Sequence, residues 1–228
     1  MAQTTATETT AAAVLAELVE LDDPKARLIN ARHGDDHGVN LGQLRAVAKR
    51  PKAQPGLARE LWGTGDTAAR LVAILIFRPK EFAPGEVDVL LRQAGIPKVH
   101  DWFVNYVVNK SPHAEELRLA WFADPDPVAA SAGWALTADR IAKNPEGLDL
   151  AGILDLIEAR IKDAPDRLQW AMNNCLAQIG IEHAEYRARA IDIGERLEVL
   201  KNYPTPPNCT SPFAPIWIAE MVSRQLPA

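Results

Sequence analysis

The sequence of 228 residues has little cysteine: its two cysteines, Cys175 and Cys209, are far apart and form no CxxC pair. This argues against a zinc site and against a disulfide framework. Long apolar runs are also missing, since the longest, Leu71–Phe77, is far shorter than the roughly 18 residues needed to cross a bilayer. The N-terminus lacks the positive and apolar regions of a secretory signal. We therefore predict a cytoplasmic protein without a membrane partner.

Strict alternation of apolar and polar residues, the pattern of a half-buried strand, is absent as well. Apolar residues recur instead at helical spacing, and Pro, Gly or Asp separates one apolar segment from the next. The fold class predicted from this pattern is all-α. The expected helices span residues 11–21, 41–49, 57–62, 67–77, 84–94, 99–109, 114–122, 128–143, 148–161, 167–179, 184–200 and 215–226.

A weak internal repeat links two of these helices. Leu57–Asp66 is similar to Leu117–Asp126, and an alanine-rich segment follows each of them. Short helices with short breaks are typical of an α-solenoid built from HEAT-like helical pairs, and an irregular helical bundle is the alternative. We predict one domain over residues 1–228, with residues 1–10 as a disordered tail.

The formal net charge is −5, yet residues 25–60 carry eight Lys and Arg against three Asp and Glu. Four of these cations, Arg45, Lys49, Arg50 and Lys52, lie in or just after the helix predicted over residues 41–49. A basic surface on an acidic protein can bind phosphates locally. The alternative is a solvated helix end, where cations are favourable without any ligand.

Two histidines, His33 and His37, precede that helix with two aspartates between them. They could be metal ligands, but Gly34 and Gly38 make a helical pair unfavourable and no cluster of Cys or His accompanies them. We predict a loop that contacts phosphate or caps the following helix, with no metal and no cofactor.

Residues 201–215 are rich in proline, with five prolines between positions 204 and 215. Proline restricts the backbone to extended and turn conformations, so this segment is expected to be stiff. It is interpreted as a strap that holds the last helix. The alternative is a surface that presents Tyr203, Phe213 and Trp217.

Several motifs resemble those of the DNA alkylation repair enzyme family, the HEAT-like-repeat glycosylases that excise 3-methyladenine and 7-methylguanine. They are His37–Arg45 (HGVNLGQLR) and Leu61–Gly65 (LWGTG) followed by Arg70. The resemblance extends from about Leu28 to the last helix. Segments such as Gln169–Asn174 and Tyr203–Trp217 are typical of a divergent branch.

The resemblance implies a site in which a carboxylate stabilises the sugar cation while aromatic side chains hold the deoxyribose. Asp101 is the best counterpart of the catalytic Asp, but Pro97 occupies the place of the Trp four residues earlier. At other positions of the site the family carries Trp and Arg, where this sequence has Ser131, Asn174 and Ala177. Trp134 is a further aromatic that either lines the concave face or fills the core. Besides the four cations above, the DNA contacts expected are Arg70, Trp102, Tyr106 and Trp170.

The function indicated is recognition and repair of alkylated DNA, by a monomer that contacts double-stranded DNA through its phosphate backbone and whose candidate glycosylase carboxylate for alkylated purines is Asp101. Glycosylase activity at Asp101 is expected to be weak or absent, because the supporting groups are missing. One alternative is a non-catalytic module for unusual or branched DNA. The other is a scaffold that binds a peptide in the solenoid groove.

Overall fold

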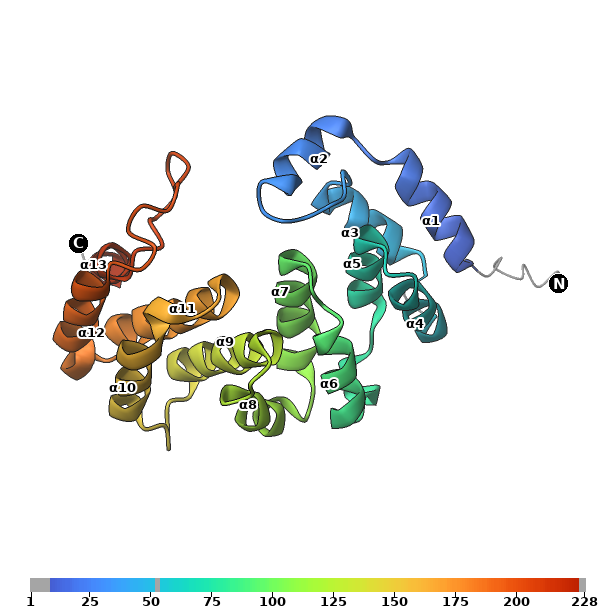
Figure 1. Cartoon of the computed structure of the whole chain (residues 1–228). Coiled ribbons are helices and arrows are strands. Elements are labelled where there is room, and N and C mark those ends of the chain that lie inside the picture. The colour runs from blue at the N-terminus through green and yellow to red at the C-terminus, as the bar shows by residue number, and fades with distance from the viewer. Residues whose placement is uncertain (1–8, 52–53, 226–228) are drawn as a thin grey trace. The chain divides into compact units, whose positions relative to one another are not determined.

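The computed structural model describes residues 9–51 and 54–225. Within these residues the regular secondary structure is helical and no strand occurs (Figure 1), which confirms the all-α prediction. The chain divides into two compact units, unit 1 over Met1–Ala114 and unit 2 over Glu115–Ala228. Of the tail predicted over residues 1–10, residues 1–8 lie outside the described part of the chain.

Unit 1 is organised around one helix, α5 (Thr67–Ile76), which packs against α1, α3, α4 and α7. α5 begins where the Asp66 carboxylate accepts a hydrogen bond from Ala69 N at 2.8 Å. Nearly all of its residues are buried, as expected for a helix that is apolar on every side. The other elements are α1 (Ala11–Glu20), α2 (Pro24–Ala31), α3 (Leu41–Lys49), α4 (Pro55–Gly63), η1 (Pro79–Glu81), α6 (Pro84–Arg92), α7 (Pro97–Tyr106) and η2 (Val108–Lys110).

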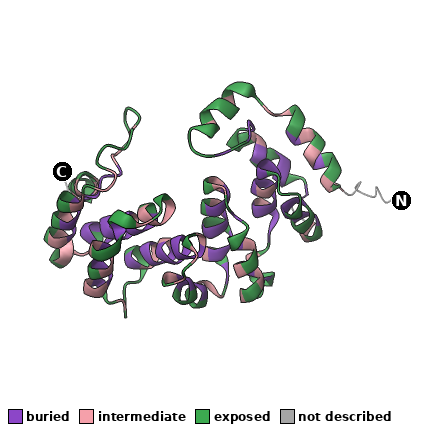
Figure 2. Ribbon diagram, viewed as in Figure 1, coloured by how far each residue is buried: buried purple, intermediate pink, exposed green. Residues whose placement is uncertain are grey.

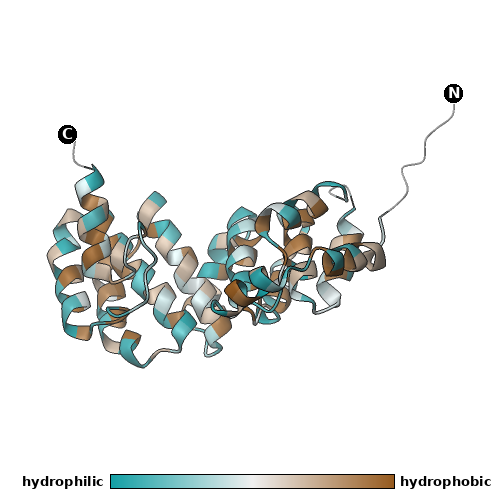
Figure 3. Ribbon diagram, turned by 90° about the horizontal axis from the view of Figure 1, so that it is seen from above, coloured by the Kyte–Doolittle hydropathy of each residue, from teal (hydrophilic) through white to brown (hydrophobic). Residues whose placement is uncertain are grey.

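Unit 2 is organised around α11 (Asp166–Glu182), which packs against α9, α10, α12 and α13. Small residues let its helices approach closely: a Cβ added to Gly133 of α9 would stand 2.6 Å from the carbonyl carbon of Trp121 in α8. Both units contain helices that carry hydrophobic as well as hydrophilic residues (Figure 3). The remaining elements are α8 (Ala114–Phe122), α9 (Pro127–Lys143), α10 (Leu150–Arg160), η3 (Ile161–Asp163), α12 (Ala184–Leu197) and α13 (Ala214–Gln225).

The helix α2 is the element that the sequence pattern does not predict. It begins at an Asp-Pro step: the Asp23 carboxylate accepts a hydrogen bond from Lys25 N at 2.6 Å, and Pro24 fills the first helical position. Each of its eight residues is described, and none is buried (Figure 2). A helix without a buried apolar stripe gives no periodic signal, so the sequence pattern indicates at the Asp-Pro step only that the helix predicted over residues 11–21 has ended.

The proline-rich segment joins α12 to α13. Its last part is attached to α11, because the buried Asn173 amide donates a hydrogen bond to Pro212 O at 2.8 Å and Phe213 is buried beside it. Its middle, residues 206–209, is exposed, and the segment extends away from α12 and α13 (Figure 1). α12 ends at Leu197 rather than at the predicted residue 200, because Glu198 adopts a left-handed conformation with φ of 56°.

Candidate nucleic-acid interface

The exposed face of α3 presents two cations, Arg45 and Lys49, one helical turn apart. The opposite face of the helix is fixed in the core by Leu44, Val47 and Ala48. Within residues 9–51 and 54–225, neither cationic side chain forms an ion pair or hydrogen bond. The two charges are therefore available to phosphates, and their four-residue spacing places them on the same face.

The two cations that follow them differ. Arg50 lies beside Lys49 but donates a hydrogen bond from Nη2 to the Glu17 carboxylate of α1, so part of its charge is neutralised within unit 1. Lys52, the fourth cation predicted to bind DNA, lies outside the described residues.

Arg70 holds three elements of unit 1 together. Its guanidinium lies over the Trp62 ring at 5.1 Å from the centroid, and Nη1 donates to Gln93 O at 2.9 Å. The Trp62 indole donates in turn to the Gln93 side chain at 2.7 Å, which joins α4 to the end of α6. Arg70 is half-buried and bound to the protein, so we place it outside the interface.

The loop between α2 and α3 contains two buried polar side chains, Asp35 and His37. His37 Nδ1 accepts a hydrogen bond from Val39 N at 3.2 Å, and Lys98 Nζ of α7 lies 3.4 Å from the Asp35 carboxylate. Burial lowers the pKa of His37, which keeps the imidazole neutral. Asp35 Oδ1 and His37 Nε2 have no hydrogen-bond partner among the described residues. The loop thus connects α2, α3 and the start of α7, the helix that carries Asp101.

Asp101 is an open carboxylate on α7. Its side chain is 67% exposed, and the buried His100 places Nδ1 3.4 Å from Oδ1. Trp102 and Tyr106 form an edge-to-face pair on the same helix, with ring centroids 5.4 Å apart, and Tyr106 is exposed. Pro97, one turn before Asp101, offers no aromatic face. The carboxylate therefore stands in water rather than between aromatic walls.

Unit 2 has an aromatic pair of its own. Trp170 of α11 and Tyr203 of the proline-rich segment meet edge to face, with centroids 5.0 Å apart, and both are exposed. Trp134 differs, because it is buried and stacked on Phe122 at 4.4 Å. Of the aromatic side chains considered from sequence, Trp134 belongs to the core, whereas Tyr106 and Trp170 are exposed and Trp102 is half-buried.

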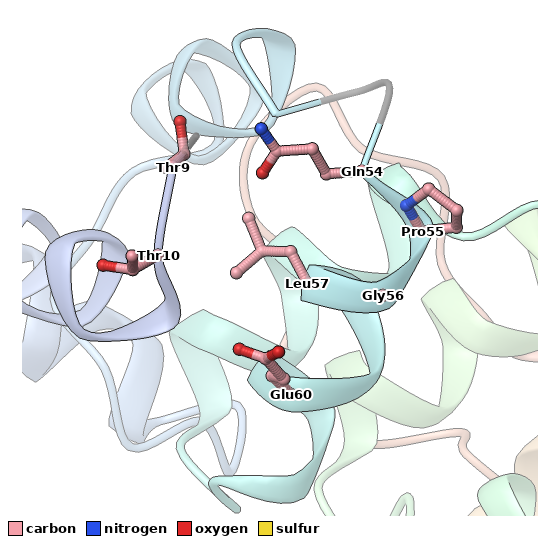
Figure 4. Close-up of a pocket in the computed structure, with 7 residues that line it drawn as sticks. All are labelled: Thr9, Thr10, Gln54, Pro55, Gly56, Leu57 and Glu60. Atoms are coloured by element: carbon pink, nitrogen blue, oxygen red, sulfur yellow. The ribbon is translucent and has the colours of Figure 1, made fainter. Parts of the chain in front are cut away.

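A shallow hollow lies between the starts of α1 and α4, and none of the candidate DNA-contacting residues lines it (Figure 4). Glu60 is the ionisable residue of its lining, so the hollow has no cation to attract a phosphate. The lining residues are Thr9, Thr10, Gln54, Pro55, Gly56, Leu57 and Glu60.

The profile of the DNA alkylation repair enzyme family matches residues 14–218. The chain belongs to this family. A solved structure from "a new family of proteins related to the HEAT-like repeat DNA glycosylases with affinity for branched DNA structures" is 24% identical, with a TM-score of 0.77 over 95% of each chain. The fold is therefore the HEAT-like α-solenoid that the sequence predicts. No curated protein sequence matches this chain.

Two positions at which the DNA alkylation repair family is expected to carry active-site groups are inside unit 2. Ser131 is buried in α9, where its hydroxyl donates to Pro127 O, and Ala177 of α11 is fully buried. A large cationic side chain at Ala177 would displace core residues. The third position, Asn174, is half-buried. Ser131 and Ala177 are therefore parts of the packed interior of unit 2.

Metal sites and membrane-spanning helices were also considered for the described residues. Among the described residues, no group of three or more His, Cys, Asp or Glu side chains is placed to hold a metal ion. Across residues 9–51 and 54–225, no helix is sufficiently long and apolar to span a bilayer. Sequence reasoning missed Lys25 and Arg32 as individual candidates, since α2 itself was not predicted. The Asp-Pro step before α2 is the signal that identifies it.

Proposed function

We propose that this protein binds branched DNA through the exposed cations of α3 and excises methylated purines weakly or not at all. One contrast carries the proposal: Arg45 and Lys49 are exposed and unpaired among the described residues, whereas Asp101 lacks the supporting groups of a glycosylase site. Cations that are not engaged with the protein give affinity for phosphate, which does not require catalysis.

The chemistry of excision explains why Asp101 alone is a poor catalyst. A carboxylate stabilises a developing sugar cation well only where water is excluded, because water screens the charge. The Asp101 side chain is 67% exposed, and Pro97 stands where an aromatic wall is expected. Loss of a single well-placed electrostatic group reduces turnover by about a hundred- to a thousand-fold.

Exposed aromatic pairs support branched DNA as the target. Every base has an aromatic face, and stacking on a protein ring does not depend on sequence. Such faces are accessible where strands part. Tyr106 is the exposed ring of the first pair, Trp102–Tyr106, and both rings of the Trp170–Tyr203 pair are exposed. The affinity for branched DNA stated for the structurally similar protein agrees with this target.

The binding test compares a four-way junction with a linear duplex of the same arm sequence in a series of salt concentrations. We expect tighter binding to the junction and an affinity that falls steeply with salt for both DNAs. Equal affinity for both would contradict the branched target. Absence of salt-dependent binding to either DNA would favour the peptide-binding alternative.

The catalytic test measures release of 7-methylguanine from methylated duplex under single-turnover conditions. The unchanged protein and Asp101→Asn should release the base at similar, near-background rates. Rapid release that disappears in Asp101→Asn would establish a glycosylase and would show that other residues support the carboxylate, with Trp102 and Tyr106 the first to examine.

A further inference from the structure

The helix α2 has its polar side towards the protein and its apolar side towards water. Arg27 donates to both carboxylate oxygens of Asp22, at 2.6 and 3.1 Å, and also to Asp36 O. The Asn30 amide donates to His37 O at 2.8 Å. Hydrogen bonds therefore hold the helix on unit 1, where helices are ordinarily held by buried apolar side chains.

The outward side of α2 combines two aliphatic side chains with two cations. Leu28 is 69% exposed and Ile29 is 56% exposed. Lys25 and Arg32 are also exposed. They are seven residues apart, which is about two helical turns, so both lie on the strip of helix surface between Leu28 and Ile29. These four side chains form what we call the α2 face. The sequence of α2 contains no acidic residue.

We propose that the α2 face binds DNA at an interruption of the base stack, which rests on the proposed binding of branched DNA. Lys25 and Arg32 contact phosphates on either side, and Leu28 or Ile29 packs against the exposed base. Aliphatic side chains are used in this way by proteins that insert a wedge between base steps. At a branch point the base stack is easier to open than in an intact duplex, so the unstacking that such insertion requires costs less there.

Charge is the reason for choosing DNA as the occupant. Within the described part of the chain, the Lys25 and Arg32 side chains form no ion pair or hydrogen bond, and residues 25–60 hold eight cations against three acids. A polyanion with accessible apolar surfaces matches that combination. A peptide partner would have to supply both acids and apolar groups. A helix that binds a membrane surface ordinarily has a longer apolar face than the two aliphatic side chains of α2 provide.

The test uses full-length Leu28→Ala/Ile29→Ala, since alanine removes the apolar volume and retains high helix propensity. Val19→Ala is the matched control, because Val19 is 76% exposed on the adjacent α1. We expect affinity for the four-way junction to fall about tenfold in the double variant, with linear duplex affinity and its salt slope unchanged. Lys25→Gln/Arg32→Gln should weaken binding to both DNAs.

A second readout reports on the branch itself. A 2-aminopurine at the branch point should become brighter when the unchanged protein or Val19→Ala binds, and much less so with Leu28→Ala/Ile29→Ala. A junction preference that survives in this double variant would overturn the role of the α2 face while leaving the proposed function intact. No preference in the unchanged protein would overturn both.

Other occupants of the α2 face are excluded by the same variants. Binding to phosphatidylserine–phosphatidylcholine vesicles that the double variant loses, with its junction binding unchanged, would identify a membrane surface instead. A dimer that the double variant converts to monomer, again with unchanged junction binding, would identify a second copy of the chain. Either result overturns the proposal.

Discussion

The two units of the molecule differ in how they use charge. Unit 1 contains 14 Lys and Arg against 13 Asp and Glu, whereas unit 2 contains 11 against 17. The net charge of −5 is therefore almost entirely a property of unit 2. Attraction to a polyanion is concentrated in unit 1, and within it in the segment that forms α2 and α3.

Pairing of charges widens this difference. In unit 2, Glu158 forms ion pairs with both Arg189 and Arg196. Glu115 likewise forms ion pairs with both Arg118 and Arg140. These cations stabilise contacts between helices and are partly neutralised. Arg27 of α2 is paired with Asp22, and Arg50 at the end of α3 is paired with Glu17. Among the described residues, the cations of these two helices that form no such pair are Lys25, Arg32, Arg45 and Lys49. Unit 1 also pairs cations with acids, for example Arg59 with Glu86, but it leaves these four exposed and unpaired within the described residues.

The largest expected effect is on the packing of unit 2. Gly133→Ala should lower the free energy of unfolding by about 3 kcal/mol, because the new Cβ meets the rigid backbone of α8. Urea unfolding measures this loss. Gly56→Ala in α4 is the control, since its Cβ would meet nothing within 4 Å, and it should be neutral or stabilising.

DNA binding by the Gly133→Ala protein, measured under conditions in which the variant is still folded, tests the difference between the two units. Its salt slope should equal that of the unchanged protein, because the phosphate contacts are assigned to unit 1. A reduced slope would place such contacts in unit 2 and remove the distinction between the units.

The next effect is on the phosphate contacts themselves. Arg45→Gln/Lys49→Gln should reduce DNA affinity roughly fiftyfold at low salt and lower the salt slope by about two, one for each lost contact. The matched control, Lys80→Gln/Lys110→Gln, removes two exposed lysines from the neighbouring turns η1 and η2. Equal losses in both double variants would mean that net charge, and not the α3 face, determines binding.

A smaller effect is expected from the aromatic pair of unit 2. Trp170→Ala should weaken junction binding about fivefold, since stacking of one base on an aromatic ring contributes on the order of 1 kcal/mol. Tyr203→Phe keeps the ring and should bind normally. Fluorescence anisotropy with junction and linear duplex separates a role at the branch from a general loss.

The smallest effect concerns acid pH. The hydrogen bond from Arg118, followed by that from Arg140, lowers the pKa of Glu115 to about 2. A lowered carboxyl pKa stabilises the fold above the ordinary pKa of about 4.3, and this stabilisation is lost as pH falls towards the folded value. Glu115→Gln should therefore cost about 1 kcal/mol at pH 7, a modest amount because half of the Glu115 side chain is in water.

Urea unfolding at a series of pH values tests this prediction. The difference between Glu115→Gln and the unchanged protein should shrink between about pH 4 and pH 2. Glu146→Gln, an exposed change in the same unit, should show no such pH dependence. A constant difference at all pH values would mean that the ion pair is not its source.

The sequence predicts most helices because their apolar stripes are buried, as in α5 and α11. It does not predict α2, whose fold depends on a cap and on hydrogen bonds to a distant loop. It identifies the cations of α3, yet the attachment of Arg50 to Glu17 and of Arg70 to Trp62 depends on tertiary contacts. For the same reason, composition alone does not separate the buried Trp134 from the exposed Trp170.

The absence of buried side chains from the described helix α2 affects how this helix opens. The sensitivity of an opening reaction to urea is proportional to the surface that it exposes. Release of α2 exposes no buried side chain of the helix itself, so we expect urea to promote exchange of its amide protons less than that of α5, which requires exposure of the core. We therefore expect α2 to open while the remainder of unit 1 stays folded, once the hydrogen bonds of Arg27 and Asn30 are broken.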